Sequence, residues 1–393
     1  MLIRSLRLDG FLSFAPGSEP FELRPLNVLI GPNGSGKSNV IEALGLLAAL
    51  PTDLAGAVRR GGGVREWIWK GTPEATSAVI EVLVWAAGRL AGLDMRHHLT
   101  LGSDGSRLEV LEEVITEAQS SERLQGLGYL YYFLQGSGTI TALVKDGKRI
   151  ARTEPGETLE TNQSIIAQRK DPHQYPEVTW LSNAYSNIRT YSEWVFGSRS
   201  PVRRPQGTDL PTDMLLPDAS NLALVLNEIE HAGNHSINDL LKRFFPLFER
   251  LSIRLWGGSA SIYLFETGAG LPTPATRLSD GMLRFLALLA ALYSPSPPSV
   301  LCIEEPELGL HPDAVALLAD VLVAVSNRTQ LVITTHSDSL VSALTSHGDS
   351  IVKCERLGTG TVLNRVDPDE LASWLGDYTL GDLWRMGVMG ANP

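Results

Sequence analysis

The sequence predicts an α/β fold built around a mainly parallel sheet, and three observations carry that prediction. A compact apolar run at 26–30 ends abruptly at a glycine-rich loop, and a helical segment at 39–50 follows. Beyond residue 277, helical segments alternate with apolar runs, at 281–293, 300–303, 312–326 and 331–335. Continuous apolar runs are typical of strands buried on both faces, and their alternation with helices indicates parallel connections.

The rest of the chain lacks this alternation of helices and continuous apolar runs. Apolar positions before residue 15 predict a short strand pair. Short strands and a hairpin turn at Asp146-Gly147 are predicted after residue 78, at 79–85, 127–135, 139–144 and 148–150. Residues 151–215 are rich in Pro, Ser, Arg and Gln, and amphipathic helices are predicted at 221–230 and 237–248.

These patterns divide the chain into three parts. Residues 1–150 are predicted to form the N-terminal half of the main domain together with an antiparallel β subdomain. Residues 151–250 are predicted to be a partly helical insertion, and residues 251–393 the C-terminal half of the main domain. Both ends of the chain then build one sheet.

Bulk properties narrow the function classes. The 393 residues include 33 Lys and Arg against 44 Asp and Glu, a formal net charge of −11, which argues against a surface covered in positive charge for nucleic acid. The apolar stretches are shorter than a membrane span requires, and the N-terminus does not resemble a signal peptide. The two cysteines, Cys302 and Cys354, lack metal-ligand spacing. A cytoplasmic protein without membrane contact is the simplest interpretation.

The glycine-rich loop carries the strongest chemical signal. It has G-x-x-x-x-G-K-S spacing between a predicted strand and a predicted helix, and its residues are Gly31, Pro32, Asn33, Gly34, Ser35, Gly36, Lys37 and Ser38. Phosphates require many inward-facing N–H groups, and glycines let the backbone approach them closely. We expect Lys37 to neutralise the β- and γ-phosphates of ATP and the Ser38 hydroxyl to bind Mg²⁺. An ordinary glycine turn is the alternative that this context disfavours.

The apolar run 300–303 ends in two acidic residues, Glu304 and Glu305. We predict that Glu304 holds Mg²⁺, directly or through water, and that Glu305 is the general base or positions the attacking water. Taken alone, acids at this place usually mark a strand end that meets solvent. Their position on the same predicted sheet as the glycine loop favours the catalytic interpretation.

Two further segments complete the candidate site. Ser279 and Gly281 stand at the start of a predicted helix, where backbone donors and the helix dipole favour an anion. Ser279 or Asp280 as a simple N-cap explains the same residues, and the two roles are compatible. His336 follows the apolar run 331–335 and is predicted to contact the γ-phosphate and the attacking water, although a lone histidine is more often structural.

These four motifs, in this order, resemble those of the ABC ATPase class. Residues 31–38 resemble Walker A, 278–281 the signature motif, 300–305 Walker B, and His336 the switch histidine. The residues of these motifs most resemble those of RecF/SMC-like ATPases, and the resemblance includes Asn39 directly after the glycine loop. Further segments resemble an uncharacterised bacterial subfamily of these ATPases, at 175–177, 220–224 and 380–384.

The resemblance implies Mg-ATP as the ligand and a homodimer that encloses two nucleotides. Ser279 and Gly281 would contact the nucleotide held by the glycine loop of the partner subunit. The sequence departs from the ABC pattern at Glu304, where most members have Asp, and at Asp280 and Met282 in the signature. The glutamine that joins Mg²⁺ and water in this class has no clear counterpart. Gln163 is our choice and Gln168 the second, with a surface glutamine as an equal alternative.

Three functions remain open for such an ATPase. The first is an ATP-gated machine that acts on DNA in repair or phage defence, and the second is the ATPase subunit of a transporter. The third is a nucleotide-gated scaffold that controls a partner toxin or nuclease. The long separation between Ser38 and Ser279 disfavours the transporter. Basic residues that could contact DNA form two groups, Arg199, Arg203 and Arg204, and Lys145, Lys148, Arg149 and Arg152.

Overall fold

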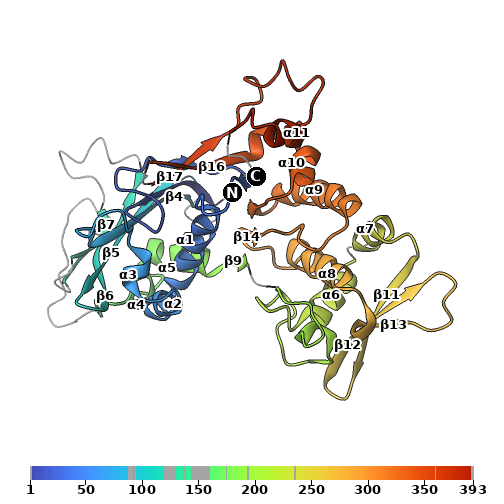
Figure 1. Cartoon of the computed structure of the whole chain (residues 1–393). Helices are drawn as coiled ribbons and strands as arrows, with labels where there is room; N and C mark the ends of the chain where they lie inside the picture. Colours follow the sequence, from blue (N-terminus) through green and yellow to red (C-terminus); the bar gives the residue numbers. More distant parts are fainter. Residues whose placement is uncertain are drawn as a thin grey trace.

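The computed structural model describes residues 2–86, 92, 94–118, 130–135, 139–142, 160–173, 175–192, 194–233, 236–358 and 360–390. Within these residues, three sheets and the helices between them build the fold (Figure 1). The central sheet has the strand order β17-β16-β3-β15-β14-β9. All its pairings are parallel except that of β16 with β17, which confirms the predicted α/β fold with a mainly parallel sheet.

Five strands of the central sheet come from the two ends of the chain, and the sixth, β9, comes from the middle, within the segment predicted to be an insertion. Their bounds are Leu26–Ile30 (β3), Ile188–Tyr191 (β9), Val300–Glu304 (β14), Gln330–Thr334 (β15), Ile351–Leu357 (β16) and Gly360–Arg365 (β17). Strands β3 and β15 are buried along their whole length, as expected for strands covered on both faces. Because β3, β14 and β15 are parallel neighbours, their carboxyl ends meet at one edge of the sheet. The glycine loop, the acidic pair and His336 lie at these ends.

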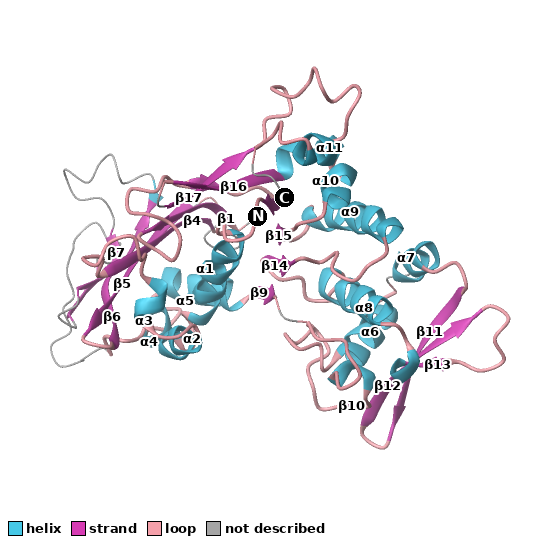
Figure 2. Ribbon diagram, in the orientation of Figure 1, coloured by secondary structure: helices cyan, strands magenta, loops and turns pink. Residues whose placement is uncertain are grey.

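The central sheet separates two hydrophobic cores. Val28, Ile30, Leu301 and Ile303 face one core, whereas Leu29, Val300 and Cys302 face the other. The first core is built mainly by helices α6 (Leu222–His231), α8 (Asp280–Leu292), α9 (Pro312–Ser326) and α10 (Asp338–Ala343). The second contains α1 (Lys37–Ala49) and α5 (Pro176–Ser186), and Figure 2 shows these helices on the other side of the sheet.

An antiparallel sheet covers the outside of the α1 core. Its order is β2-β1-β4-β5-β6-β7-β8, with every pairing antiparallel. The bounds are Ile3–Asp9 (β1), Phe21–Glu22 (β2), Ser77–Trp85 (β4), Asp94–Asp104 (β5), Arg107–Glu117 (β6), Leu130–Gln135 (β7) and Thr139–Ala142 (β8). Short helices α2 (Leu54–Arg60) and α3 (Val64–Trp67) lie beside it. The predicted strand 148–150 and its turn lie outside the described residues.

The middle of the chain contains helices, short strands and a second antiparallel sheet. Its elements are α4 (Ile165–Gln168), η3 (Pro201–Arg203), β10 (Gln206–Gly207), α7 (Ser236–Phe244), β11 (Phe248–Trp256), β12 (Ser259–Glu266) and β13 (Thr273–Pro274). The predicted helix 237–248 is wrong at its end. Pro246 cannot continue a helix, so α7 ends at Phe244 and β11 starts at Phe248.

Short elements complete the C-terminal part. They are η4 (Ala275–Arg277), η5 (Thr345–Ser350) and α11 (Leu380–Arg385). Thr379 caps α11 in a capping box with Asp382. Among the described residues, no helix combines the length and the apolar character needed to cross a membrane.

Candidate nucleotide-binding site

The loop between β3 and α1 has the backbone conformation that a phosphate cradle requires. Gly31, Gly34 and Gly36 have φ angles of 147°, 76° and 101°, which favour glycine. A Cβ on Gly31 would lie 2.2 Å from the Cys354 carbonyl oxygen, and one on Gly36 would lie 2.4 Å from Thr361 Oγ1. Gly34 has open space around it, so its φ angle alone requires glycine. Pro32 and Asn33 are exposed at the tip.

Lys37 lies inside the loop. Its Nζ donates hydrogen bonds to the carbonyl oxygens of Gly31 at 2.7 Å and Pro32 at 3.0 Å. Burial lowers the pKa of Lys37, and the nearby carboxylates of Glu304 and Glu305 oppose that shift. A buried ammonium group at the mouth of a ring of backbone donors is suited to bind an anion.

Three polar side chains support the loop from below. Thr361 Oγ1 donates to the Ser35 carbonyl at 2.8 Å and lies 2.7 Å from Ser13 Oγ, and Asn39 Nδ2 donates to Ser13 Oγ at 2.7 Å. The chain supplies Ser13 and Thr361 from opposite ends, and neither belongs to a motif that the sequence reveals. A cavity of about 410 Å³ opens beside them, and its lining includes Asn39, Ile68, Trp69, Lys70 and Arg356.

The acidic strand end lies next to the start of α1. Ser38 Oγ is 3.4 Å from Glu304 Oε2, so the predicted hydroxyl and carboxylate ligands of Mg²⁺ are neighbours although they are far apart in sequence. Mg²⁺ sites at nucleotides usually combine one or two protein oxygens with phosphates and water.

Glu305 and His336 face one another at this edge. Glu305 Oε1 is 4.0 Å from His336 Nε2, and their side chains are 42% and 31% exposed. Glu305 has a φ of 44°, a conformation that L-residues rarely adopt, and its N–H donates to the Thr334 carbonyl at 3.0 Å. Burial and the positive charge of Lys37 lower the pKa of His336, whereas Glu305 opposes the shift. Rare backbone conformations persist where the surroundings enforce them, often at functional sites.

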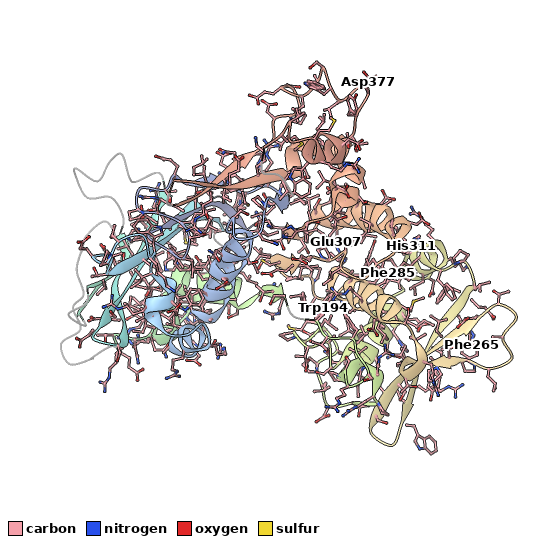
Figure 3. The ribbon with its side chains drawn as sticks, viewed as in Figure 1. Trp194, Phe265, Phe285, Glu307, His311 and Asp377 are labelled. Carbon is pink, nitrogen blue, oxygen red and sulfur yellow. The ribbon has the colours of Figure 1, made fainter. Side chains whose placement is uncertain are left out.

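Glu307 connects the acidic strand end to the histidine loop. Its Oε1 accepts hydrogen bonds from Thr335 Oγ1 at 2.5 Å and from the His336 N–H at 3.2 Å. Its Oε2 is buried without a hydrogen-bond partner in the described part of the chain. Burial raises the pKa of Glu307. Figure 3 labels this residue near the centre of the molecule, and no sequence pattern predicted a role for it.

The serine–glycine segment lies on the other side of the central sheet. Ser279 caps α8, with Oγ accepting from the Met282 N–H at 3.1 Å, and it is exposed. Gly281 approaches Gly309 so closely that a Cβ would lie 2.9 Å from the Gly309 carbonyl oxygen. Among the described residues, no hydrogen bond or ion pair joins 278–281 to the glycine loop. The two motifs belong to different faces of one protomer.

The structure places the remaining candidates elsewhere. Gln163 Oε1 accepts from the Leu54 N–H at the start of α2, and Gln168 bonds to Glu160 and Gln163. Arg199 and Arg204 are exposed, but the Arg203 side chain is only 10% exposed and donates to neighbouring backbone carbonyls. The second basic group, Lys145 to Arg152, lies outside the described residues.

The central sheet and the loop at 31–38 resemble those of P-loop ATPases of the ABC and SMC kind. Residues 26–342 match the model of a family described as "AAA domain, putative AbiEii toxin, Type IV TA system". The chain therefore belongs to this AAA-domain family.

Short stretches of the chain are similar to curated Smc proteins. The chromosome partition protein Smc of Mycobacterium tuberculosis is 42% identical over 73 residues, 18% of this chain and 6% of that protein. The Smc protein of Halothermothrix orenii is 27% identical over 154 residues, 37% of this chain and 13% of that protein. The chain thus aligns with only a small part of these relatives.

Solved Smc heads share the fold over nearly the whole chain. The Smc head bound to the C-winged helix domain of ScpA superposes with a TM-score of 0.55 and 14% identity, and covers 95% of this chain and 100% of that one. The Smc head with an extended coiled coil from Pyrococcus furiosus gives 0.55 and 13%, covering 96% and 99%.

Proposed function

We propose that this protein binds Mg-ATP in the loop 31–38 and hydrolyses it within a homodimer, each site being completed by residues 279–281 of the partner subunit. The observation that carries the proposal is the meeting of Lys37, Ser38, Glu304, Glu305 and His336 at one sheet edge. Ser279 lies exposed on the other side of the sheet, at a helix N-terminus suited to phosphate.

The residues present fit magnesium and a triphosphate. Ser35 Oγ is buried in the loop and has no hydrogen-bond partner within the described residues, so it offers a free donor. Among the described residues, no cluster of three or more His, Cys, Asp or Glu side chains could hold a metal ion by itself. Ser38 and Glu304 would therefore bind Mg²⁺ together with phosphate oxygens and water. When bound, Mg²⁺ neutralises charge on the phosphates.

We assign Glu305 and His336 to the water molecule that attacks the γ-phosphate. The Glu305 carboxylate would orient a water molecule and accept its proton as the water oxygen attacks the γ-phosphorus. The bond to the bridging oxygen then breaks, and ADP and phosphate leave. His336 has a lowered pKa, so its neutral form persists to lower pH and can donate or accept a hydrogen bond at this water.

Glu305→Gln tests the catalytic assignment. The amide retains the size of the side chain but cannot accept the proton, so turnover should fall by at least about 10²-fold while ATP affinity is kept. Light scattering should show the 42.6 kDa chain shift to a dimer with Mg-ATP. Turnover equal to that of the unmodified chain would refute the role of Glu305.

A mixture of two inactive variants tests the shared site. Lys37→Ala should lose ATP binding by about tenfold or more, and Ser279→Arg should keep binding but lose turnover. In a mixed dimer one site combines the intact loop of one chain with the intact signature of the other. A 1:1 mixture should therefore regain about a quarter of normal turnover, as random pairing of two subunits requires. No recovery would show that each protomer works alone.

We further propose that the ATP-closed dimer acts in DNA maintenance or phage defence with a separate effector. The family description, which refers to a toxin–antitoxin system, and the Smc likeness support this proposal. A nucleotide-gated scaffold that controls a toxin or nuclease without binding DNA is the alternative. ATPase rates with and without duplex DNA separate the two, because DNA stimulation through phosphate contacts must weaken steeply with salt.

A further inference from the structure

An arginine from a distant part of the chain holds the segment that precedes α8. Arg203 is the last residue of η3, and only 10% of its side chain is exposed. Its guanidinium donates to three carbonyl oxygens and one carboxylate, those of Ala275 (3.1 Å), Thr276 (3.4 Å), Leu278 (2.7 Å) and Asp280. We call residues 275–280, which these bonds hold, the signature loop.

The same arginine is fixed on its own side. Arg203 Nε donates to the Phe196 carbonyl at 2.9 Å, so all three guanidinium nitrogens are engaged. A second arginine makes the reverse contact: Arg284 of α8 donates to the Trp194 carbonyl at 3.4 Å, and its guanidinium lies 5.4 Å from the Phe196 ring centre. The segment 194–203 and the start of α8 thus hold each other, and Figure 3 labels Trp194 and Phe285 of α8 in this region.

This segment begins next to the acidic strand end. It follows β9, whose Tyr191 pairs with Ile303, the residue before Glu304. The segment 194–203 therefore follows a strand of the predicted catalytic edge and, through Arg203, contacts the signature loop. A planar guanidinium can bridge several acceptors in a fixed geometry, whereas a lysine ammonium cannot span them.

We propose that Arg203 is a positioning residue of the composite site. It fixes the signature loop so that Ser279 and the N-terminus of α8 meet the nucleotide held by the partner subunit. This inference rests on the proposed function, since it assigns Arg203 to the signature half of a shared site. Ser279 itself is exposed, and within the described part of the chain its side chain makes one hydrogen bond, the cap to Met282 in its own helix, so its position depends on the loop behind it.

Arg203→Met and Arg203→Lys test the assignment, with Arg204→Met as the matched control because Arg204 is adjacent and exposed. Both Arg203 variants should keep ATP affinity within about twofold and lose turnover by about tenfold or more, whereas the control should not change. Thermal unfolding establishes that each variant is folded. Asp280→Asn, which removes only the negative charge from the contact with Arg203, should produce a smaller loss in the same direction.

Mixing experiments separate a positioning role from a general structural one. Arg203→Lys mixed with Lys37→Ala should regain turnover, because the intact signature then comes from the second chain. Arg203→Lys mixed with Ser279→Arg should stay inactive, because both chains lack a working signature. Recovery in the second mixture, or none in the first while Lys37→Ala with Ser279→Arg recovers, overturns the assignment of Arg203. Failure of that reference mixture as well overturns the composite site itself.

Discussion

At the scale of single residues, the site depends on carboxylates whose surroundings differ sharply. Glu305 is half-exposed and faces His336, whereas Glu307, two positions later, has one oxygen bound to Thr335 and His336 and the other buried without a partner in the described chain. An unpartnered buried carboxylate oxygen destabilises the ionised form. Glu307 therefore connects Thr335 and His336 to the end of β14, but the burial of its ionised carboxylate lowers the free energy of unfolding.

This cost predicts a pH dependence. Burial raises the pKa of Glu307 above its unfolded value of about 4.3, so between the two values the folded state binds more protons than the unfolded one. The free energy of unfolding should consequently fall as pH rises from about 4.3 through the folded pKa, and then level off. Glu307→Gln should remove this slope. Urea unfolding at several pH values measures it, and an unchanged slope would contradict the assignment.

At the scale of elements, a buried polar network joins the antiparallel sheet to the middle of the chain. Glu113 of β6 is fully buried and accepts from Ser164 Oγ at 2.6 Å and the Ile165 N–H at 2.8 Å. His97 Nε2 lies 3.1 Å from the same carboxylate, and its Nδ1 lies 3.0 Å from the Tyr185 hydroxyl. One carboxylate thus connects β5, β6, α4 and α5.

Removing the Glu113 carboxylate should lower the free energy of unfolding far more than removing the neighbouring carboxylate of Glu112. Glu113→Ala leaves the Ser164 hydroxyl, the Ile165 N–H and His97 without their buried acceptor, so the free energy of unfolding should fall by about 3 kcal/mol. Glu112→Ala, at the neighbouring and partly exposed position, should change it by less than about 0.5 kcal/mol. Chemical denaturation measures both, and equal losses would show that the network contributes nothing specific.

The elements also show what sequence patterns can predict. Long helices and fully buried strands were predicted closely; α9 has the predicted bounds, and α8 starts and ends one residue early. Strand β9 was missed, because four residues with mixed burial carry no periodicity. The residues of each motif are contiguous, so their roles could be predicted from the sequence. The contacts of Thr361 with Ser35 and of Arg203 with Leu278 could not be predicted, since only tertiary folding brings these residues together.

At the scale of the whole molecule, charge opposes the association that the proposed function requires. Each protomer carries a formal charge of −11, and a dimer brings two such bodies together. The proposed interface contacts are short and partly buried, so salt screens them little, whereas repulsion between the remaining surface charges is long-ranged. The Debye length falls from about 30 Å at 0.01 M to about 8 Å at 0.15 M ionic strength.

The ATP-trapped dimer should therefore become more stable as salt is added over this range. Analytical ultracentrifugation of Glu305→Gln with Mg-ATP should show a lower dimer dissociation constant at 0.15 M than at 0.01 M. Contacts to DNA phosphates would respond in the opposite direction, because added salt makes the release of counterions from the DNA less favourable. A dimer that dissociates on adding salt would instead indicate an interface dominated by exposed charge pairs, and the buried phosphate contacts proposed for Ser279 would then have to be abandoned.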